Sequence, residues 1–592
     1  MKKFKYSHNN KKAKILFFLL GLSIITFGCK KALDLNPITE LTDAAEWKTP
    51  NDFKLGANAF YTYERTYKNA WFDYPTDPSN QEPHSDCRSD IIVLTAALNP
   101  FSNGKNTILQ TDATYSGDYA HIHNINYMLA KAAAYADPAS IKQYVAEAKF
   151  FRAYVYFDLL QVYGGVPLIS TTLTTTSPEL YAPRNTRDEI ADFIISDLNA
   201  AIPDLPLQSN IASADLGRVS QGAAQGFLSR VALYEGTWQE FRGNTSRATQ
   251  LLTVAQAAAN SVITSAQYSL FEPSALGDSA QKYMFILENQ KSNPANITKS
   301  ANNEYILANR YDQTVRQINL NISHSAFADG LTPTRKFVNM YLCADGLPVD
   351  KSPLFQGYGT MNSEFINRDN RMRYNLMPAG GNYWSNAKYR IDWNGDAADL
   401  AHAAFLNFLP TFNDGYQNQK WASERNVPDN QEGYDYPVIR YAEILLNYAE
   451  ATFELNGSIS DADLDKSLNL VRLRVNKNMP KLSNELAAAN GLDMRTEIRR
   501  ERTIEFYLEG FRIDDLKRWK TAETEMPMDI QGVQWTGTQF QTTWPGASSI
   551  PKDPTGVLIF ETGRAWAQKD YLLPLPQQEL TLNPKLTQNP GW

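Results

Sequence analysis

The stretch that decides the fold lies late in the chain, where residues 441–455 read YAEILLNYAEATFEL. Its apolar residues recur at i, i+3, i+4, i+7 and i+8, namely at Tyr441, Ile444, Leu445, Tyr448 and Ala449. Glutamates and an asparagine occupy another face, so the spacing predicts an amphipathic helix. Asn456-Gly457 ends this helix, and after a short polar loop residues 464–475 are predicted to form the return helix of a hairpin.

Earlier segments repeat this order of helix, short loop and helix. Residues 147–163 carry a broad apolar face and stop at Gly164-Gly165. Residues 220–234 stop near Gly236, and residues 246–262 form an alanine-rich helix behind them. Small residues at crossing positions are typical of stacked tetratricopeptide-type pairs, although no strict period of about 34 residues is found. The chain is therefore predicted to be mostly α, with degenerate helix pairs.

The segments between the helices differ in composition, being rich in Gly, Pro, Asn, Asp and aromatic residues. Structureless loops longer than about 15 residues are uncommon in compact domains. We therefore expect an irregular, loop-rich lobe with short strands, such as residues 283–287, packed against the helices. The helical repeat lobe is expected mainly at 120–262 and 438–520, and the irregular ligand-binding lobe mainly at 68–118, 264–437 and 520–570.

The N-terminus has the features of an export signal. Six lysines precede a 13-residue apolar run at 15–27, too short to cross a hydrocarbon core of about 30 Å as a helix. Gly28-Cys29 follows directly and resembles a bacterial lipobox, in which Cys29 becomes the lipidated first residue. The alternative is a soluble exported protein with a free cysteine. We expect a signal peptide at 1–28, a lipidated tether and first helix start at 29–56, and a single body at 57–592.

The composition excludes several classes of protein. Lys and Arg total 57 against 64 Asp and Glu, for a net charge of −7, which argues against non-specific binding of nucleic acid. Three cysteines cannot build a disulfide scaffold or a four-cysteine zinc site. Whether Cys87 and Cys343 form a disulfide is left open by the sequence.

Motifs for phosphate binding, dinucleotide binding, serine hydrolysis and zinc proteolysis are absent from the sequence. His121 and His123 would diverge on a helix, so we predict neither a metal site nor a cofactor. The charged run 497–512 places Glu497, Glu501, Glu505 and Glu509 on one helical stripe with arginines beside them. We favour an ion-pair network over a catalytic role for this run. A pair of glycosidase carboxylates is not picked out by any local motif.

Several segments together resemble the SusD/RagB family of outer-membrane lipoproteins from the Bacteroidetes. Cys29 is followed by Leu33-Asp34-Leu35-Asn36-Pro37, as in the opening of that family. The resemblance continues at 146–153, 163–168, 217–220, 439–451, 501–519, 573–580 and 583–592. The final aromatic residue is Trp592, where the family usually has Tyr. These motifs span almost the whole chain after the signal peptide.

This resemblance implies a SusD-like fold of four tetratricopeptide-like helix pairs beside a loop-rich lobe. It also implies a lipid-anchored protein at the outer cell surface, without enzymatic activity. The implied partner is a SusC-like, TonB-dependent outer-membrane barrel, over which the binding protein closes as a lid. The implied cargo is an oligosaccharide, with peptides as the alternative. The ligand residues of the family vary with the cargo, so the resemblance transfers none of them.

Glycan sites combine aromatic platforms with polar side chains, because sugar rings offer apolar C–H faces and a rim of hydroxyls. Clusters of this kind occur in the irregular stretches, and they give the candidate ligand-binding residues Trp71, Tyr74, Asp77, Tyr305, Arg310, Trp384 and Trp393. Two functions from other classes remain open. One is a surface glycoside hydrolase, and the other is a tetratricopeptide-type scaffold for a protein partner.

Overall fold

The computed structural model describes residues 47–71, 82–94, 101–320, 322, 331–360, 362–378, 415–424 and 430–592. The expected signal peptide at 1–28, Cys29 and most of the expected tether lie outside these residues. The first described helix, α2 (Pro50–Phe60), begins where a helix start was expected, because Thr49 and Asp52 form a capping box at its N-terminus.

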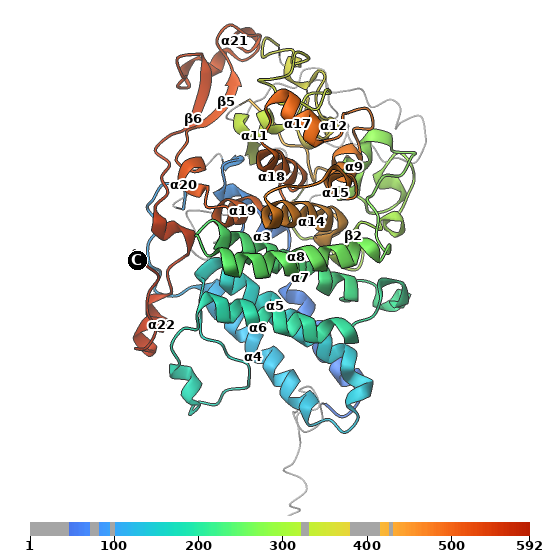
Figure 1. The fold of residues 1–592 in the computed structure, drawn as a ribbon, viewed down its shortest axis with the longest axis vertical. Helices are drawn as coiled ribbons and strands as arrows, with labels where there is room; N and C mark the ends of the chain where they lie inside the picture. Colours follow the sequence, from blue (N-terminus) through green and yellow to red (C-terminus); the bar gives the residue numbers. More distant parts are fainter. Residues whose placement is uncertain are drawn as a thin grey trace, which may run out of the picture.

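Long helices stacked on one another form the lower part of the molecule in the view of Figure 1. Neighbouring helices in this stack pack on each other in sequence order, α4 on α5, α5 on α6 and α7 on α8, and α8 then packs on α14. The bounds of these helices are α4 (Ala113–Ala133), α5 (Lys142–Tyr163), α6 (Arg187–Ala201), α7 (Gln221–Glu240), α8 (Thr245–Thr264) and α14 (Tyr441–Asn456).

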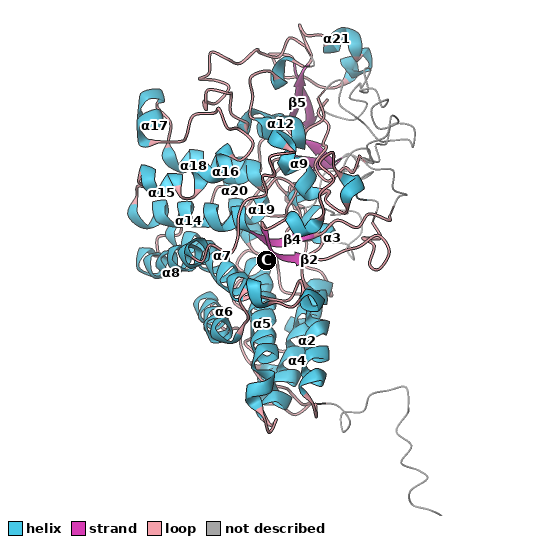
Figure 2. Ribbon diagram, turned by 90° about the vertical axis from the view of Figure 1, so that its right-hand side faces the viewer, coloured by secondary structure: helices cyan, strands magenta, loops and turns pink. Residues whose placement is uncertain are grey.

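Most of the short helices and the loops lie beyond α14, in the upper half of the view in Figure 2. The short helices are α3 (Tyr67–Trp71), α9 (Ala280–Phe285), α11 (Arg335–Met340), α12 (Asn370–Asn375), α15 (Asp461–Asp465), α16 (Leu468–Leu473), α17 (Asn484–Asn490), α18 (Met494–Glu505), α19 (Arg512–Arg518), α20 (Ala522–Glu525), α21 (Phe540–Thr543) and α22 (Gln577–Leu582).

The described strands form three antiparallel pairs of two strands each. β1 (Ile92–Leu94) pairs with β3 (Leu331–Pro333), and β5 (Ile530–Gln534) pairs with β6 (Val557–Glu561). The third pair joins β2 (Tyr305–Asn309) to β4 (Tyr436–Arg440), which leads directly into α14. The predicted mostly α fold with short strands is confirmed. The tetratricopeptide-like character of the pairs and the proposed division into lobes stay predictions.

One predicted helix end is wrong, and packing explains why. α7 was expected to stop near Gly236 but continues to Glu240. A Cβ at Gly236 would lie 3.0 Å from Leu252 Cγ and 3.2 Å from Leu252 N of α8, so this glycine permits close helix contact and does not end the helix. Gly164, in contrast, ends α5 with φ at 78°, as predicted.

Two further local predictions are wrong. Residues 283–287 were expected to form a strand, but Tyr283, Met284 and Phe285 lie in helix α9, which ends before Ile286. A short apolar run does not separate a buried strand from a buried helix turn, and Ala280-Gln281-Lys282 before it favour helix. The return helix expected at 464–475 is divided into α15 and α16 at Ser467, whose φ and ψ of −137° and −101° are not helical.

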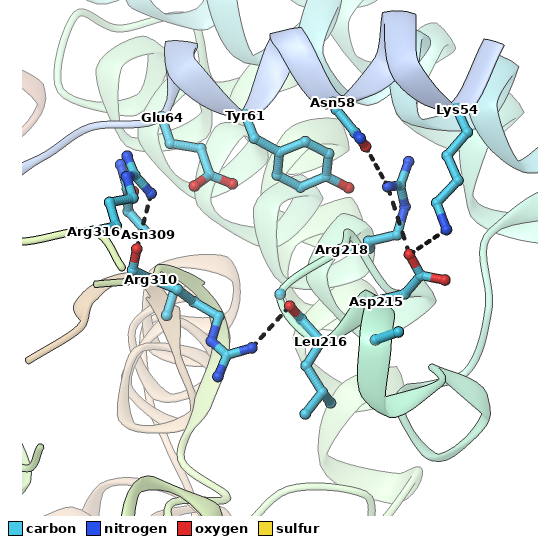
Figure 3. A pocket seen from close by; sticks show the side chains of 13 residues that line it. Lys54, Asn58, Tyr61, Glu64, Asp215, Leu216, Arg218, Asn309, Arg310 and Arg316 are labelled. Carbon is cyan, nitrogen blue, oxygen red and sulfur yellow. Dashed lines mark hydrogen bonds and ion pairs between the residues drawn. The ribbon is translucent and has the colours of Figure 1, made fainter. Parts of the chain in front are cut away.

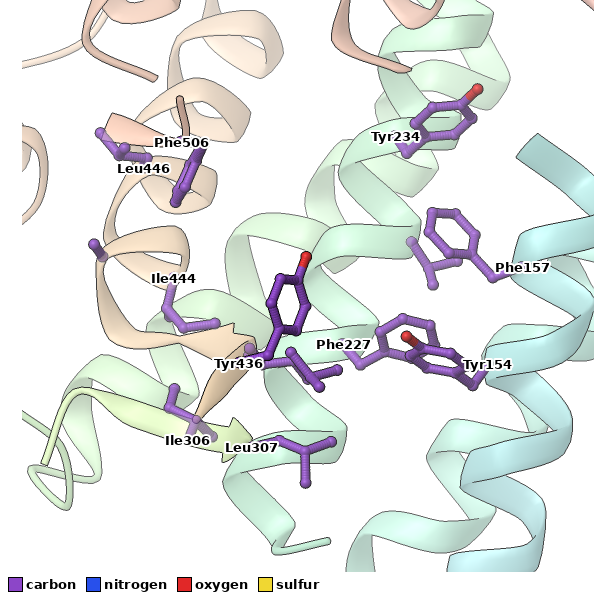
Figure 4. Packing of buried hydrophobic residues seen from close by; sticks show 14 of the residues in the cluster. Tyr154, Phe157, Phe227, Tyr234, Ile306, Leu307, Tyr436, Ile444, Leu446 and Phe506 are labelled. Carbon is purple, nitrogen blue, oxygen red and sulfur yellow. The ribbon is translucent and has the colours of Figure 1, made fainter. Parts of the chain in front are cut away.

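The buried core joins the helical stack to the β2–β4 pair (Figure 4). Tyr154 of α5 and Phe227 of α7 stack with ring centroids 5.2 Å apart, and Phe157 meets Phe227 edge to face. Tyr436 of β4 and Ile444 of α14 belong to the same cluster. Each large side chain buried here contributes about 1.5–3 kcal/mol, so the strand pair is held firmly against the helices.

The charged run 497–512 forms the buried ion-pair network that the sequence favoured. Glu505 of α18 is fully buried and contacts three guanidiniums: Arg440 at 2.7 Å, Arg371 at 3.2 Å, and Arg474. Burial alone would raise the pKa of Glu505, but the guanidiniums of Arg474, Arg440 and Arg371 lower this pKa well below its usual range.

The same network includes two further carboxylates, those of Glu304 and Glu509. Glu304 accepts from Arg474 at 2.7 Å and from Arg440 at 2.9 Å. Glu509 accepts from Arg440 at 2.7 Å and from Lys420 at 2.7 Å. Each carboxylate therefore faces at least two cations, which ties α18, β4 and the segment before β2 together.

Cys87 and Cys343 are both buried, and no disulfide joins them. Within the described part of the chain, no helix is both long enough and apolar enough to cross a membrane.

Candidate functional site

Two adjoining cavities of about 360 Å³ and about 370 Å³ lie where α2, the segment 202–220 and the end of β2 meet. Arg310 lines both cavities, and its Nη1 donates to Leu216 O at 3.0 Å. Figure 3 shows the first cavity, with side chains reaching into it from all three segments. The walls common to both cavities are formed by Leu216, Gly217, Arg218, Ala308 and Arg310.

Helix α2 supplies a polar stripe to the first cavity. Lys54, Asn58 and Tyr61 are spaced i, i+4 and i+7, so they lie on one side of the helix and its continuation. The neighbouring side of the helix carries the buried residues Phe53, Ala57 and Phe60. Lys54 and Asn58 were not among the candidate residues named from the sequence, although the periodicity of the helix could have revealed this polar stripe.

The segment before α7 supplies a second wall. Arg218 donates to both carboxylate oxygens of Glu147, at 3.0 Å and 2.6 Å, and to Asn58 Oδ1 at 2.5 Å. The neighbouring Gly217 has a φ of 99°, and a Cβ there would lie 2.8 Å from Arg310 Cδ. Glycine at this position therefore leaves room for the stem of Arg310.

Strand β2 and the turn after it supply the third wall. The Tyr305 hydroxyl donates to Met284 O at 3.3 Å, which fixes the ring beside the second cavity. In the turn, Asp312 and Arg316 exchange backbone hydrogen bonds of 2.7 Å and 3.1 Å. Arg316 Nη1 also donates to Arg310 O at 2.9 Å, so the turn brings the two arginines together.

An ammonium group holds the base of this turn. Lys299 Nζ donates to Tyr311 O, Gly433 O and Asp435 Oδ1, each at 2.6 Å. Tyr311 N also donates to Asp435 Oδ1 at 2.9 Å. Lys299 and Asp435 both line the second cavity, so one internal cation links the segment before β2 to the residues before β4.

Glu64 lies in the wall of the first cavity with an unusual environment. Only 4% of this residue is exposed, and its Oε1 has no hydrogen-bond partner among the described residues. Burial raises the pKa of Glu64 to about 8, and the positive charge of Arg316 offsets only part of this effect. Asn309 Oδ1, in the same wall, is also buried without a partner.

Two of the candidate residues named from the sequence, Tyr305 and Arg310, are brought together at the second cavity. Trp71 is the last residue of α3, and nothing is described of its side chain. The remaining candidates, which are Tyr74, Asp77, Trp384 and Trp393, lie outside the described residues. Their roles as ligand residues therefore stay predictions.

His121 and His123, which were considered as metal ligands, both lie on α4 but contact different residues. His121 stacks on the ring of Tyr63 with centroids 3.8 Å apart. His123 lines a separate cavity of about 600 Å³ with Tyr115, Ile122 and Leu180 among its walls. In the described residues, no group of three or more His, Cys, Asp or Glu side chains is placed to hold a metal ion.

Together the walls of the two cavities offer hydrogen-bond donors, hydrogen-bond acceptors and aromatic rings to a small ligand. The donors are the lysine, asparagine and arginines of the walls, and the acceptors are the unpartnered oxygens of Glu64 and Asn309. Tyr61 and Tyr305 are the aromatic residues among these walls. The fold and the site together describe a mostly helical protein. Its candidate ligand site lies in polar cavities beside the β2–β4 strand pair.

The chain belongs to the SusD family, because the model described as "SusD family" matches residues 285–592, just over half of its length. A second model, described as "Starch-binding associating with outer membrane", matches residues 58–233. A SusD-like protein of Bacteroides ovatus is 24% identical over 88% of this chain and 89% of its own. The SusD-like protein P38 of Formosa agariphila is 30% identical over 36% of this chain and 40% of its own.

Solved structures support the same fold. A SusD-like carbohydrate binding protein from Bacteroides fragilis aligns with a TM-score of 0.69 at 22% identity, covering 91% of this chain and 99% of its own. A laminarin binding SusD-like protein aligns with a TM-score of 0.56 at 21% identity, covering 92% of this chain and 99% of its own.

Proposed function

We propose that this protein binds an oligosaccharide at the cell surface and delivers it to a SusC-like, TonB-dependent transporter in the outer membrane, without acting as an enzyme. The observation that carries the proposal is the pair of adjoining polar cavities that share Arg310 in their walls, in a chain of the SusD family. Related proteins are described as binding starch, laminarin or carbohydrate, which supports a glycan as the cargo.

The chemistry of the walls suits a sugar. Tyrosine rings can cover the C–H faces, while arginine and asparagine donors and carboxyl acceptors reach the hydroxyl rim. Tyr305 and Arg310 line the same cavity of about 370 Å³, so one sugar residue bound there can contact both types of group. Tyr305 therefore serves as the first test position.

Isothermal titration of the purified protein against a panel of plant, fungal and algal oligosaccharides tests the binding. We expect at least one glycan to bind, and we expect Tyr305→Ala to weaken that binding about ten-fold through loss of ring contact. Tyr181→Ala is the matched control, because Tyr181 is an exposed tyrosine, 53% accessible, away from both cavities.

The alternatives give different results in the same titration. Peptides binding in place of glycans would identify a peptide carrier, and slow release of shorter sugars would identify a glycoside hydrolase. Blank titrations with both ligand classes, together with a captured protein partner, would favour the scaffold role. Any of these results contradicts delivery of glycan cargo.

The partner and the anchor require separate tests. A SusC-like barrel is expected to co-purify with this protein from detergent-solubilised outer membranes. Cys29 is proposed as the lipid attachment site, since it follows the apolar segment of the leader directly. Cys29→Ala should release the protein from the membrane fraction and abolish labelling with a radioactive or clickable fatty acid. Unchanged fractionation and labelling would refute the anchor.

A further inference from the structure

The cations around the first cavity differ in how they are neutralised (Figure 3). Lys54 pairs with Asp215 at 2.6 Å. Arg218 pairs with the buried Glu147 through two hydrogen bonds, so its charge is balanced within the protein. Both of these cations therefore belong to the scaffold of the cavity, and neither supplies an unbalanced charge.

Arg310 and Arg316 are different, because no carboxylate lies within 4.0 Å of either one among the described residues. Each guanidinium is held by a backbone carbonyl: Arg310 by Leu216 O at 3.0 Å, and Arg316 by Arg310 O at 2.9 Å. Arg316 also lies over the ring of Tyr311, 4.7 Å from its centroid. These contacts fix the two side chains in place, while most of their five N–H donors stay available.

The buried polar groups of the same wall complement this arrangement. Glu64 keeps its carboxyl protonated at neutral pH, because burial raises its pKa to about 8. A protonated carboxyl can donate a hydrogen bond and does not repel an anion. Oε1 of Glu64 and Oδ1 of Asn309 are both buried without partners, which indicates that a ligand supplies the missing hydrogen bonds.

We propose that this cavity recognises a negatively charged substituent, a carboxylate or a sulfate ester, and that the cargo is therefore an acidic oligosaccharide. The inference rests on the proposed glycan-binding function and names its substrate class. Arg310 and Arg316 bind the anionic group, since a guanidinium matches the planar oxygens of such groups with paired donors. Glu64 and Asn309 bind hydroxyls of the same sugar residue.

Titration with oligosaccharides of equal length tests the substrate class directly. The probes are a neutral maltohexaose and laminarihexaose, a hexagalacturonate that carries carboxylates, and a carrageenan hexasaccharide that carries sulfates. We expect one of the two charged probes to bind at least about 10-fold more tightly than the neutral ones. This preference should shrink as NaCl is raised from 20 to ~500 mM, because the two arginines are exposed to screening.

Substitutions of the arginines locate the site. Arg310→Gln and Arg316→Gln should each lower affinity for the charged probe about 10-fold and leave weak binding of neutral probes unchanged. Arg316→Lys, which keeps the charge but loses the paired donors, should give an intermediate loss. Arg247→Gln on α8 is the control for net charge, since Arg247 pairs with Asp192 at 2.5 Å on the helical stack.

The outcomes separate this inference from the proposed function. Equal affinity for neutral and charged probes would overturn the acidic substrate class and leave glycan binding intact. A charged-probe preference that survives both glutamine variants would overturn the assignment to this cavity. If no glycan of either kind binds, the proposed function and this inference fail together. Circular dichroism and thermal melting establish that each variant is folded.

Discussion

The ion-pair network around Glu505 and the wall of the first cavity use the same kinds of side chain for opposite purposes. In the network, each carboxylate meets at least two cations at the centre of the fold. In the cavity wall, Glu64 is buried without a partner for Oε1, and Arg310 and Arg316 lack carboxylate partners among the described residues. Compensation of charge, more than residue type, therefore distinguishes a structural cluster from a ligand site.

This difference has an energetic consequence. Removing one member of a buried ion pair leaves the other charge buried and unpaired, at a cost of about 3–5 kcal/mol. Substituting a side chain of the cavity wall that has no charge partner leaves no opposite charge unpaired. At a fixed neutral pH, stability should therefore respond more strongly to substitutions in the network than to those in the cavity wall, while ligand binding should respond in the opposite order.

The largest effect is expected for Glu505→Ala. The change leaves Arg440, Arg474 and Arg371 without their shared carboxylate, so the free energy of unfolding should fall by about 3–5 kcal/mol. Urea denaturation followed by circular dichroism measures this change. Glu485→Ala, at the exposed start of α17, is the control and should cost less than about 1 kcal/mol. Equal midpoints for the two variants would refute the structural role of the network.

The second effect concerns pH and Glu64. Its carboxyl has an ordinary pKa of 4.5 in the unfolded chain and about 8 in the folded one. Between these values the folded state holds the extra proton, so the contribution of Glu64 to stability falls as the pH rises. Glu64→Gln removes this contribution. The stability difference between the variant and the wild type should change by up to about 3 kcal/mol between pH 5 and pH 7.

The tyrosines facing Glu64 do not titrate in this range. Burial raises the pKa values of Tyr61, Tyr154 and Tyr311 above the ordinary tyrosine value of 10.0. Urea titrations at pH 5, 6, 7 and 8 check the prediction. Parallel pH profiles for the variant and the wild type would show that Glu64 is already ionised at neutral pH.

A smaller effect is expected for Lys299→Met. The ammonium serves three oxygens at 2.6 Å, and methionine keeps the length of the side chain but donates to none of them. Stability should fall by about 1–3 kcal/mol. Lys477→Met is the control, because Lys477 is 67% exposed and makes one surface pair. If both variants melt at the same temperature, the internal cation does not hold the turn.

The smallest effect is expected for Lys54→Met. Its pair with Asp215 is about one-third exposed on each side, and exposed pairs contribute about 0–1 kcal/mol. The free energy of unfolding, measured by thermal melting, should fall by no more than about 1 kcal/mol. The preference for charged glycans should persist, because Arg310 and Arg316 remain. A loss of that preference would extend the anion site to Lys54.

Much of the helical stack could be predicted from periodicity alone. The runs at 147–163, 220–234, 246–262 and 441–455 all lie in helices, because their apolar residues repeat with the period of a helix. The errors arose where a neighbour overrides local preference. Gly236 lies inside α7 because Leu252 packs against it, and Ser467 interrupts a helix whose apolar pattern continues on both sides.

The candidate site was harder to predict, because three segments far apart in sequence form it. Arg310 and Tyr305 were named from their polar, aromatic surroundings, but Asn58 and Glu64 were missed. The polar stripe on α2 can be recognised as part of a cavity wall only when the tertiary structure places the turn after β2 near it. No pattern along the chain reveals that Arg316 lacks a carboxylate or that Glu64 is buried, since both facts depend on the tertiary contacts.

Lys299 has one further consequence for the site. Three oxygen atoms around a cation resemble the way many surface proteins use a bound calcium ion to order a loop. Here the cation is covalently part of the chain, so its occupancy does not depend on the composition of the medium. The turn that carries Arg310 and Arg316 should therefore keep its shape in the presence of a chelator such as EDTA.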